Sequence, residues 1–419
     1  MIICQRKFNF YLFAPGCRSN QADGEGISHI LKENKFKRVY NIKKASYLIV
    51  LGCVVTEKAE KEAIRFIRKA KNLNPSIKVV LVGCLAERYR KEPISSIFFD
   101  YLVSNEERKF ISDILRDKKI ENAVEEGIFF AGNLEMEGRS RFFFKIQEGC
   151  NASCSYCYVR LVRGKPRSLE PEKILAHIKK LVERNVKEIV FCGTHLGIYG
   201  KESGYSLKEL LKEVEKTDGN FRFRLSSLEP WDIEDELLEV LYSSKKFCHF
   251  FHIPLQSGSE KVLKNMNRPY TPDFYQSLIL KIKKYFPMAR IGADVIVGYP
   301  QEGEKEFLET YNFIKKTPLD YLHIFTYSPR PNNPVLSKLP NDKLKERYWE
   351  LKKLDKLLRY EDMKKREGFV SEALTLDWRG ILRENYWCLF DGRKKSALLL
   401  PCKIVKWNDD KAIVEIIKR

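Results

Sequence analysis

Two successive series of short apolar runs, separated by charged stretches of helical periodicity, constrain the fold of this chain more than any other feature. In residues 1–125, the runs SYLIVL and IKVVLV have the length and composition of strands, and residues 56–73 between them have the pattern of a helix. Strands that alternate with helices build an α/β layer structure. This part of the chain therefore predicts an open, largely parallel sheet.

The alternation restarts at residue 142 and gives six further β/α units, with helices such as 171–185 and 304–317 between the strands. Six units are two fewer than a full eightfold barrel needs, which predicts a partial, open barrel with its site at the carboxyl ends of the strands. The expected strands are 142–147, 187–192, 221–226, 248–253, 290–296 and 320–325.

The remaining residues predict a linker, a long helix and a third region. Residues 129–141 are polar and read as a linker. Residues 338–367 predict one charged amphipathic helix that leads away from the barrel and turns its charge run to solvent. The last fifty or so residues alternate short strands with turns, as in a small all-β barrel.

Charge and cysteine content narrow the class of protein. Lys and Arg number 76 against 56 Asp and Glu, a formal charge of +20, which fits either a lysine-rich soluble surface or a polyanionic partner. The longest apolar run, residues 47–55, is too short to span a bilayer, so we expect a cytoplasmic protein without a membrane partner. Eleven cysteines, an odd number, favour metal or redox chemistry over disulfides there.

Three cysteines lie within eight positions directly after the first expected barrel strand. Cys150, Cys154 and Cys157 have the spacing C-x3-C-x2-C. A structural zinc site takes four ligands. A four-iron cluster held by three thiolates keeps one iron open for a ligand that must react. The spacing favours the iron–sulfur cluster, and zinc remains the alternative.

Three more cysteines, Cys17, Cys53 and Cys84, lie far apart in sequence, but each comes at the end of an expected strand. Loops of this kind gather at one edge of an open parallel sheet, so the three thiols are expected to meet. The alternative is that they are buried as small apolar side chains. The cysteines expected to be structural are Cys4, Cys192, Cys248, Cys388 and Cys402.

The motifs resemble a known family. The C-x3-C-x2-C loop with Tyr156 before its last cysteine resembles that of radical S-adenosylmethionine enzymes. G-C-x-x-N-x-x-D (16–23), G-C-x-V-T-x-K-A (52–59) and V-G-C-x-A-x-R (82–88) resemble the amino-terminal domain of methylthiotransferases. FCGTHLGIYG, RLSSLEP and PLQSGSEKVLKNMNRPYT follow in family order and look like the tRNA threonylcarbamoyladenosine branch, and the terminal barrel resembles a TRAM domain.

This resemblance implies three domains: a methylthiotransferase domain at 1–125, a radical S-adenosylmethionine domain at 136–362 and a TRAM-like RNA-binding domain at 363–419. It implies two [4Fe-4S] clusters, one on the three-cysteine loop for S-adenosylmethionine and an auxiliary one on Cys17, Cys53 and Cys84. The expected partners are tRNA, an electron donor such as flavodoxin or ferredoxin, and a sulfur source.

The implied reaction inserts a methylthio group at C2 of the threonylcarbamoyl-modified adenosine next to the tRNA anticodon. The alternatives are isopentenyl-adenosine in tRNA, an aspartate of a ribosomal protein or, in another class, a non-catalytic zinc and RNA-binding protein. Arg163, Arg167 and Arg330 are expected to be phosphate contacts or surface arginines, and Arg330 is alternatively a contact for the substrate carboxylate. The expected cofactor contacts are Gly193, Thr194, Glu229, Gln256, Ser257 and Asp294.

Overall fold

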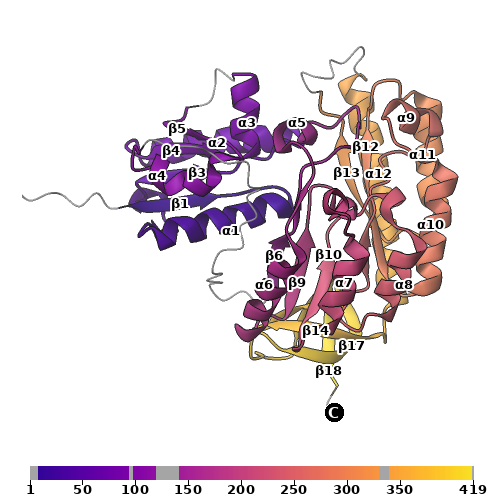
Figure 1. Cartoon of the computed structure of the whole chain (residues 1–419). Helices are drawn as coiled ribbons and strands as arrows, with labels where there is room; N and C mark the ends of the chain where they lie inside the picture. The colour runs from indigo at the N-terminus through magenta and orange to yellow at the C-terminus, as the bar shows by residue number, and fades with distance from the viewer. Residues whose placement is uncertain (1–7, 94–97, 119–140, 330–338, 418–419) are drawn as a thin grey trace, which may run out of the picture. The chain divides into compact units, whose positions relative to one another are not determined.

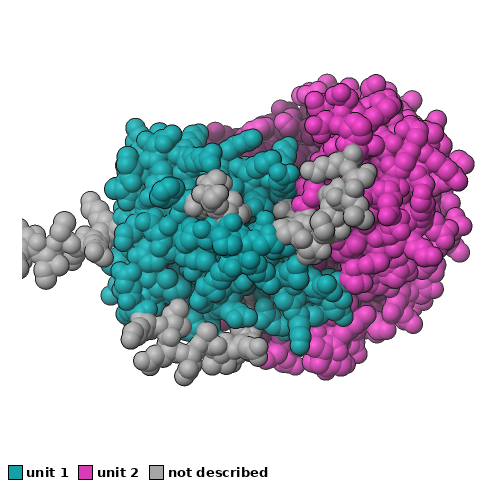
Figure 2. Space-filling model, turned by 90° about the horizontal axis from the view of Figure 1, so that it is seen from above, with its two compact units in different colours: residues 1–137, 145–152, 157–169 teal, residues 138–144, 153–156, 170–419 magenta. Residues whose placement is uncertain are grey.

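The computed structural model describes residues 8–93, 98–118, 141–329 and 339–417 (Figure 1). The chain forms two compact units, coloured separately in Figure 2. Unit 1 comprises residues 1–137, 145–152 and 157–169, and unit 2 comprises residues 138–144, 153–156 and 170–419. The three domain boundaries expected from the sequence stay a prediction. None of the described helices is long and apolar enough to cross a membrane.

The amino-terminal part of unit 1 is a five-stranded parallel sheet of order β2-β1-β3-β4-β5. Successive strand residues face opposite sides, so a strand that is buried throughout needs helices on both faces. Leu48 packs with the helix α2 and Ile49 with the helix α1. The strands are Asn9–Phe13, Lys37–Arg38, Tyr47–Val50, Lys78–Val82 and Tyr101–Val103, and the helices α1 to α4 are Arg18–Glu33, Glu57–Leu73, Cys84–Lys91 and Ile111–Ile114.

Six strands form the expected partial barrel, as two three-stranded sheets of orders β10-β9-β6 and β11-β12-β13. Two isolated parallel bridges, Phe223 to Phe247 and Ser227 to His252, join β10 to β11. The strands are Arg141–Lys145, Glu188–Cys192, Arg222–Leu225, Phe250–His252, Arg290–Val297 and Tyr321–Thr326. The helices α5 to α11 are Val159–Arg163, Pro171–Glu183, Leu207–Lys216, Asp235–Ser243, Glu260–Asn265, Pro272–Tyr285 and Glu304–Lys316. A short hairpin, β7 (Gln147–Glu148) with β8 (Arg167–Ser168), flanks the cysteine loop.

The last residues form a closed five-stranded barrel of order β14-β15-β16-β18-β17, as expected from the sequence. Its core includes Cys388 and Cys402, which are fully buried and therefore act as small apolar side chains. The strands β14 to β18 are Val370–Leu376, Arg379–Leu382, Trp387–Phe390, Leu399–Asn408 and Lys411–Ile416.

Within unit 2, this small barrel closes the end of the large barrel at which the strands begin (Figure 1). Arg222, the first residue of β10, pairs with buried Glu188 at 2.8 Å and donates to the Ile381 carbonyl at 2.7 Å. Arg290, the first residue of β12, stacks on Tyr386 at 3.6 Å from the ring centre. The carboxyl ends of the strands are therefore left for chemistry.

The long helix α12 (Asn341–Lys365) corrects one expectation, because it packs along the edge strand β13 instead of leading away. Asp355 accepts from the Leu322 amide at 2.8 Å, and Arg359 donates to the Leu322 carbonyl at 3.3 Å. An uncovered edge strand has unpaired backbone groups. Some charges of this helix are therefore buried at that edge rather than solvated.

Candidate metal centre and cofactor site

Cys17, Cys53 and Cys84 come together at the carboxyl edge of the amino-terminal sheet. The thiols of Cys17 and Cys53 share a hydrogen bond, and Cys84 interacts electrostatically with both. Gly16 has φ +101°, and a Cβ there would lie 2.6 Å from the Cβ of Cys53. Only glycine both adopts this positive φ readily and leaves room for the side chain of Cys53. The expected convergence is thus present, and the role of the thiols as ligands stays a prediction.

Polar residues of the motifs hold these loops in place. Asn20, 2% exposed, donates its side-chain amide to the carbonyls of Pro15 at 2.6 Å and Leu51 at 2.7 Å. Thr56 caps α2 by accepting from the Ala59 amide at 3.2 Å. The asparagine and threonine of the two motifs therefore fix the backbone that presents Cys17 and Cys53.

The electrostatic surroundings of the three thiols differ. Cys17 is the N-cap of α1 and Cys84 is the first residue of α3, where helix dipoles favour negative charge. The hydrogen bond from Cys17 lowers the pKa of Cys53 to about 7 and raises that of Cys17 itself. Burial raises the pKa of Cys84, and the nearby Arg163 guanidinium opposes this shift.

The spacing of these sulfurs tests which metal group they fit. Across the described ranges, one group of three Cys, His, Asp or Glu ligand atoms has all its members within 4.8 Å of one another, and it contains no cysteine. A single tetrahedral zinc ion with bonds of about 2.3 Å would draw its sulfurs to roughly 3.8 Å. A four-iron cluster bonds each thiolate to a different iron. Because the three sulfurs do not all lie within 4.8 Å of one another, they suit the separate irons of a cluster better than one zinc ion, although Cys17 and Cys53 are close enough to share a hydrogen bond.

A buried ionic network adjoins Cys84 within unit 1. Arg108 pairs with Asp23 at 2.8 Å and with Glu148 at 2.9 Å. Arg163 pairs with the same two carboxylates, each at 2.8 Å. Lys145 also contacts both. Four segments of the chain thus meet around two carboxylates, and Glu148 lies two residues before Cys150.

Arg163 differs from the sequence expectation. Its side chain is 3% exposed, and its Nε donates to Cys84 Sγ at 3.0 Å. It is therefore neither a surface arginine nor placed to contact a phosphate backbone. Arg167 is 29% exposed and lies 3.9 Å from Glu148, and Arg330 lies outside the described residues.

The loop of Cys150, Cys154 and Cys157 is divided between the units, with Cys154 in unit 2. In unit 1, the Cys150 amide donates to the Gly164 carbonyl at 3.1 Å. In unit 2, Arg268 donates to Cys154 Sγ at 3.4 Å, forms an ion pair with Glu229 and stacks on a tryptophan. Sequence reasoning named Glu229 but missed Arg268, whose signal is the NRPY segment after α9.

Unpartnered hydroxyls lie at the carboxyl ends of the barrel strands. Among the described residues, the buried side-chain oxygens of Thr194, after β9, Ser226, after β10, and Tyr327, after β13, have no hydrogen-bond partner. Burying a hydroxyl without a partner costs free energy unless a ligand supplies one. These positions therefore suit contacts to a polar cofactor. Thr194 is one of the expected contacts, whereas Ser226 and Tyr327 were not among them.

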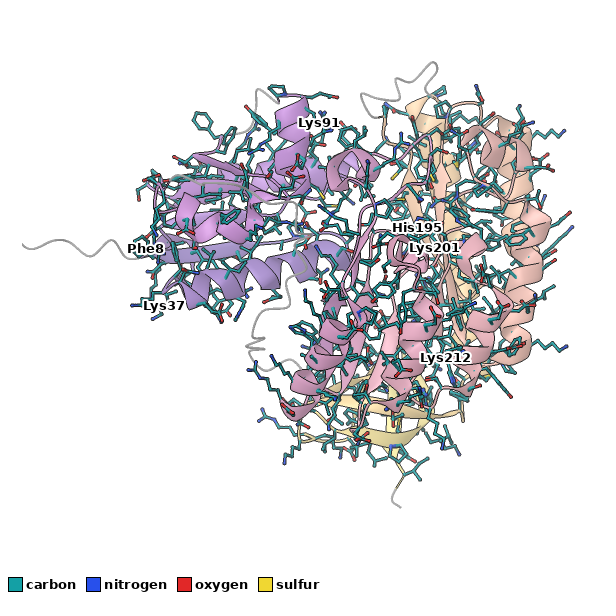
Figure 3. The ribbon with its side chains drawn as sticks, in the orientation of Figure 1. Phe8, Lys37, Lys91, His195, Lys201 and Lys212 are labelled. Atoms are coloured by element: carbon teal, nitrogen blue, oxygen red, sulfur yellow. The ribbon has the colours of Figure 1, made fainter. Side chains whose placement is uncertain are left out.

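The loop that carries Gly193 and Thr194 is held by Asp232. His195 lies 2.6 Å and Lys201 3.8 Å from its carboxylate oxygens, and Figure 3 shows both side chains on this loop. A Cβ at Gly197 would lie 2.3 Å from the Cβ of Asp232. Glycine at 197 thus allows the close approach that fixes the loop.

Asp294 lies inside the barrel in a chain of polar side chains. It accepts from His252 at 2.8 Å and lies 3.4 Å from His323, and His252 also bonds the Tyr321 hydroxyl at 2.9 Å. Burial alone would raise the pKa of Asp294, but the two histidines outweigh burial and hold this pKa well below its usual value. Asp294 is thus an anion that fits the amino or ribose group of a cofactor.

Two other expected contacts are engaged with the protein. Ser257 is fully buried, and its hydroxyl bonds that of Thr310 at 3.0 Å. Gln256 has φ 64°, and its backbone N–H donates to the backbone carbonyl of Asp294 at 2.8 Å. Both residues shape the turn after β11, and their contact with a cofactor stays a prediction.

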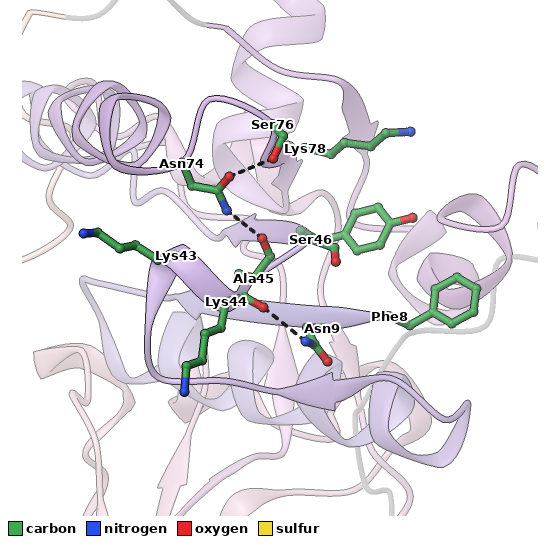
Figure 4. A pocket seen from close by; sticks show the side chains of 10 residues that line it. Phe8, Asn9, Lys43, Lys44, Ala45, Ser46, Asn74, Ser76 and Lys78 are labelled. Carbon is green, nitrogen blue, oxygen red and sulfur yellow. Dashed lines mark hydrogen bonds between the residues drawn. The ribbon is translucent and has the colours of Figure 1, made fainter. Parts of the chain in front are cut away.

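A shallow pocket of about 400 Å³ lies at the opposite edge of the amino-terminal sheet, where β1, β3 and β4 begin (Figure 4). Its polar groups bind one another: Asn9 donates to the Lys44 carbonyl at 3.1 Å, and Asn74 to that of Ala45 at 2.8 Å. The pocket is remote from the cysteines of its own sheet.

Two family models match the chain. That of the Radical SAM superfamily matches residues 144–314. That of the uncharacterized protein family UPF0004 matches residues 9–104, the sheet that holds Cys17, Cys53 and Cys84.

Named relatives cover most of the chain. The threonylcarbamoyladenosine tRNA methylthiotransferase MtaB of Aquifex aeolicus is 36% identical over 391 residues, 88% of this chain and 93% of that protein. MtaB of Bacillus subtilis is 36% identical, and the match covers 76% of this chain and 73% of that protein. The tRNA-2-methylthio-N(6)-dimethylallyladenosine synthase of Clostridium botulinum is 32% identical and covers 87% and 85%. The radical S-adenosylmethionine methyltransferase TsrM of Kitasatospora setae has a TM-score of 0.55 at 11% identity, covers 76% and 72%, and shares the fold.

Proposed function

Because the chain belongs to the radical S-adenosylmethionine methylthiotransferase family, we propose that it inserts a methylthio group at C2 of the threonylcarbamoyl-modified adenosine next to the tRNA anticodon. Family membership implies S-adenosylmethionine and one four-iron cluster; the second cluster is part of the proposal. The observation that carries it is the convergence of Cys17, Cys53 and Cys84 at one sheet edge, beside a buried guanidinium.

The two sets of cysteines would divide the chemistry between them. Cys150, Cys154 and Cys157 would hold the cluster that takes S-adenosylmethionine, and Cys17, Cys53 and Cys84 would hold the auxiliary cluster. When bound, S-adenosylmethionine and the clusters would supply the radical that removes a hydrogen atom, the sulfur that is transferred and the methyl group on that sulfur. A C–H bond on an adenine ring has no acidic proton for a general base, so removal of a hydrogen atom by a radical is a suitable way to activate it.

The barrel residues would bind and orient the cofactor. Thr194 and Ser226 offer buried hydroxyls without partners, and Asp294 offers a carboxylate that stays ionised. A hydroxyl can bond a ribose oxygen, and an anionic carboxylate can bond an ammonium group. These groups come from three different strands, which favours one fixed orientation of the bound molecule.

The charge of +20 and the small terminal barrel support a nucleic-acid substrate. The names of two relatives support the threonylcarbamoyl substrate, whereas another relative is named for the dimethylallyl substrate. The carboxylate of a threonylcarbamoyl group suits a cationic site, whereas an isopentenyl group suits an apolar one.

The test offers the anaerobically reconstituted enzyme both modified tRNAs in competition and follows the nucleosides by mass spectrometry. We expect methylthiolation of the threonylcarbamoyl nucleoside and about eight irons per chain, four for each cluster. Methylthiolation of the isopentenyl nucleoside alone would contradict the substrate. About four irons in an active preparation would contradict the second cluster.

A further inference from the structure

The ionic network beside Cys84 has one more positive charge than negative charge. Arg108, Lys145 and Arg163 are cations, and Asp23 and Glu148 are anions, each with a side chain at most 3% exposed. Two carboxylates balance two of the three cations. A buried charge without a counter-charge is strongly unfavourable. A thiolate ligand at Cys84 would bring a third anion to the network, beside Arg163.

The Cys84 thiolate is placed to be that anion. Arg163 Nη1 is held by Asp23 and Glu148 at 2.8 Å each, which turns its Nε toward Cys84 Sγ at 3.0 Å. An arginine stays protonated in proteins, and the two carboxylates fix its guanidinium before any cluster binds.

We propose that Arg163 is a positioning residue whose charge-assisted hydrogen bond to the Cys84 thiolate raises the reduction potential of the auxiliary cluster. The inference rests on the second cluster of the proposed function. Reduction adds negative charge to a cluster, so a donor and a positive charge at a ligand sulfur favour the reduced state. Arg163 is the last residue of the helix α5 and lies six residues after Cys157. It is therefore close in sequence to one cysteine set and bonded to a cysteine of the other.

The test uses the full-length chain with Cys150, Cys154 and Cys157 replaced by alanine, so that the auxiliary cluster alone can form. Into this parent we introduce Arg163→Met, and Arg108→Met as a matched control. Both variants remove one cation from the same network, but Arg108 bonds the carboxylates rather than the sulfur. Each variant leaves two buried cations beside the two carboxylates, so we expect both variants to fold.

Iron content and an EPR-monitored reductive titration are the readouts. We expect about four irons in each protein. Arg163→Met should make reduction roughly tenfold less favourable, about 59 mV more negative for one electron, and Arg108→Met should shift it less. Arg163→Lys, which keeps the charge but not the planar fork, should fall between Arg163→Met and the parent.

The outcomes separate this inference from the proposed function. A parent without iron overturns the second cluster itself. A parent that holds iron but has the same potential after Arg163→Met overturns the role of Arg163 alone. Equal shifts for Arg163→Met and Arg108→Met also overturn this role, because net charge would then act without the hydrogen bond.

Discussion

At the scale of single residues, the unpartnered hydroxyl of Thr194 predicts opposite effects on stability and binding. Thr194→Val removes a buried hydroxyl that has no partner among the described residues, so the free energy of unfolding should stay equal or rise. If the hydroxyl bonds the cofactor, binding of S-adenosylmethionine should weaken by about 1 kcal/mol, roughly fivefold. Thermal melting and equilibrium dialysis measure the two quantities.

Thr375→Val is the matched control for this substitution. The Thr375 hydroxyl is fully buried in the small barrel, donates to the Lys395 carbonyl at 2.6 Å and accepts from the Leu398 amide at 3.0 Å. Its loss should lower the free energy of unfolding by about 1–3 kcal/mol and leave cofactor binding unchanged. Unchanged binding in Thr194→Val would remove Thr194 from the cofactor site.

His249 predicts a loss of stability in mild acid. It packs against Phe286 at 5.2 Å between ring centres, and burial, with Arg383 nearby, lowers its pKa to about 4. The unfolded chain, with a pKa near 6.5, then binds more protons between these values, so stability falls as pH drops through this range. From pH 7 to 5 this histidine should account for a loss of about 2 kcal/mol.

Denaturant unfolding of wild type and His249→Phe at pH 7 and pH 5 checks this prediction, because phenylalanine keeps an aromatic ring but does not titrate. The variant should lose less stability than wild type by about the same 2 kcal/mol. Equal losses in both proteins would mean that His249 is protonated in the folded state.

Sequence reasoning could propose the six cysteines as ligands because their spacing and strand-end positions are local features. It missed the role of Arg163 because the partners of this residue come from distant segments: Asp23 from α1, Arg108 from the turn after β5 and Glu148 from β7. Asp23 is part of the first cysteine motif, which was the one sequence feature that linked this carboxylate to the cysteines. No periodicity in the sequence indicates that the carboxylates and the guanidinium meet.

At the scale of elements, the strands were predictable because their apolar runs are short and bounded by charged helices. The helix α12 was not, since its charges suggested a solvated face. Asp355 and Arg359 instead bond the buried backbone N–H and C=O of Leu322, which face away from the sheet on the edge strand β13. Which strand lies at an edge depends on the order of the strands in the sheet, and this order could not be predicted from the sequence pattern.

The small barrel carries a surface suited to RNA. Trp378 and Trp387 are 50% and 42% exposed, and Arg379 lies over both rings at 5.6 and 5.2 Å. Exposed aromatic rings beside a guanidinium can stack on unpaired bases. Trp378→Ala with Trp387→Ala should weaken tRNA binding by about 1–3 kcal/mol for each stacked base. Filter binding at several salt concentrations measures the affinity.

Trp349→Ala on α12, where the tryptophan is 62% exposed, is the control and should leave tRNA affinity unchanged. Arg379→Gln should weaken binding and also reduce its salt dependence. Substitution is a better test than deletion of the barrel, because Arg222 and Arg290 bond its backbone and would lose buried partners. An unchanged affinity in the double tryptophan variant would exclude this surface.

At the scale of the whole molecule, the order of the sheets and barrels followed from the sequence, but the grouping of segments into units did not. The strand β6 ends within unit 1, and the cysteine loop is divided between the units. The reason is physical: Lys145 and Arg163 each pair with both Asp23 and Glu148 through buried charge. Apolar periodicity gives no measure of such ionic contacts between distant segments.

The last prediction concerns the division of labour between the two cysteine sets. Cys150, Cys154 and Cys157 lie on one loop, where Arg268 contacts Cys154, whereas Cys53 follows the strand β3. Cys53→Ala should therefore keep cleavage of S-adenosylmethionine, measured as deoxyadenosine release, and lose methylthiolation of tRNA. Cys154→Ala should lose both, because the radical is needed for every later step.

Cys248→Ala is the control for cysteine removal as such, since Cys248 is fully buried and its pKa is raised by burial, as in a structural thiol. It should keep both activities at lower thermal stability. The two cysteine sets have separate tasks only if Cys53→Ala, folded by circular dichroism and with about half the wild-type iron, still releases deoxyadenosine. A folded Cys53→Ala protein that releases none would show that the amino-terminal thiols are needed for the radical itself.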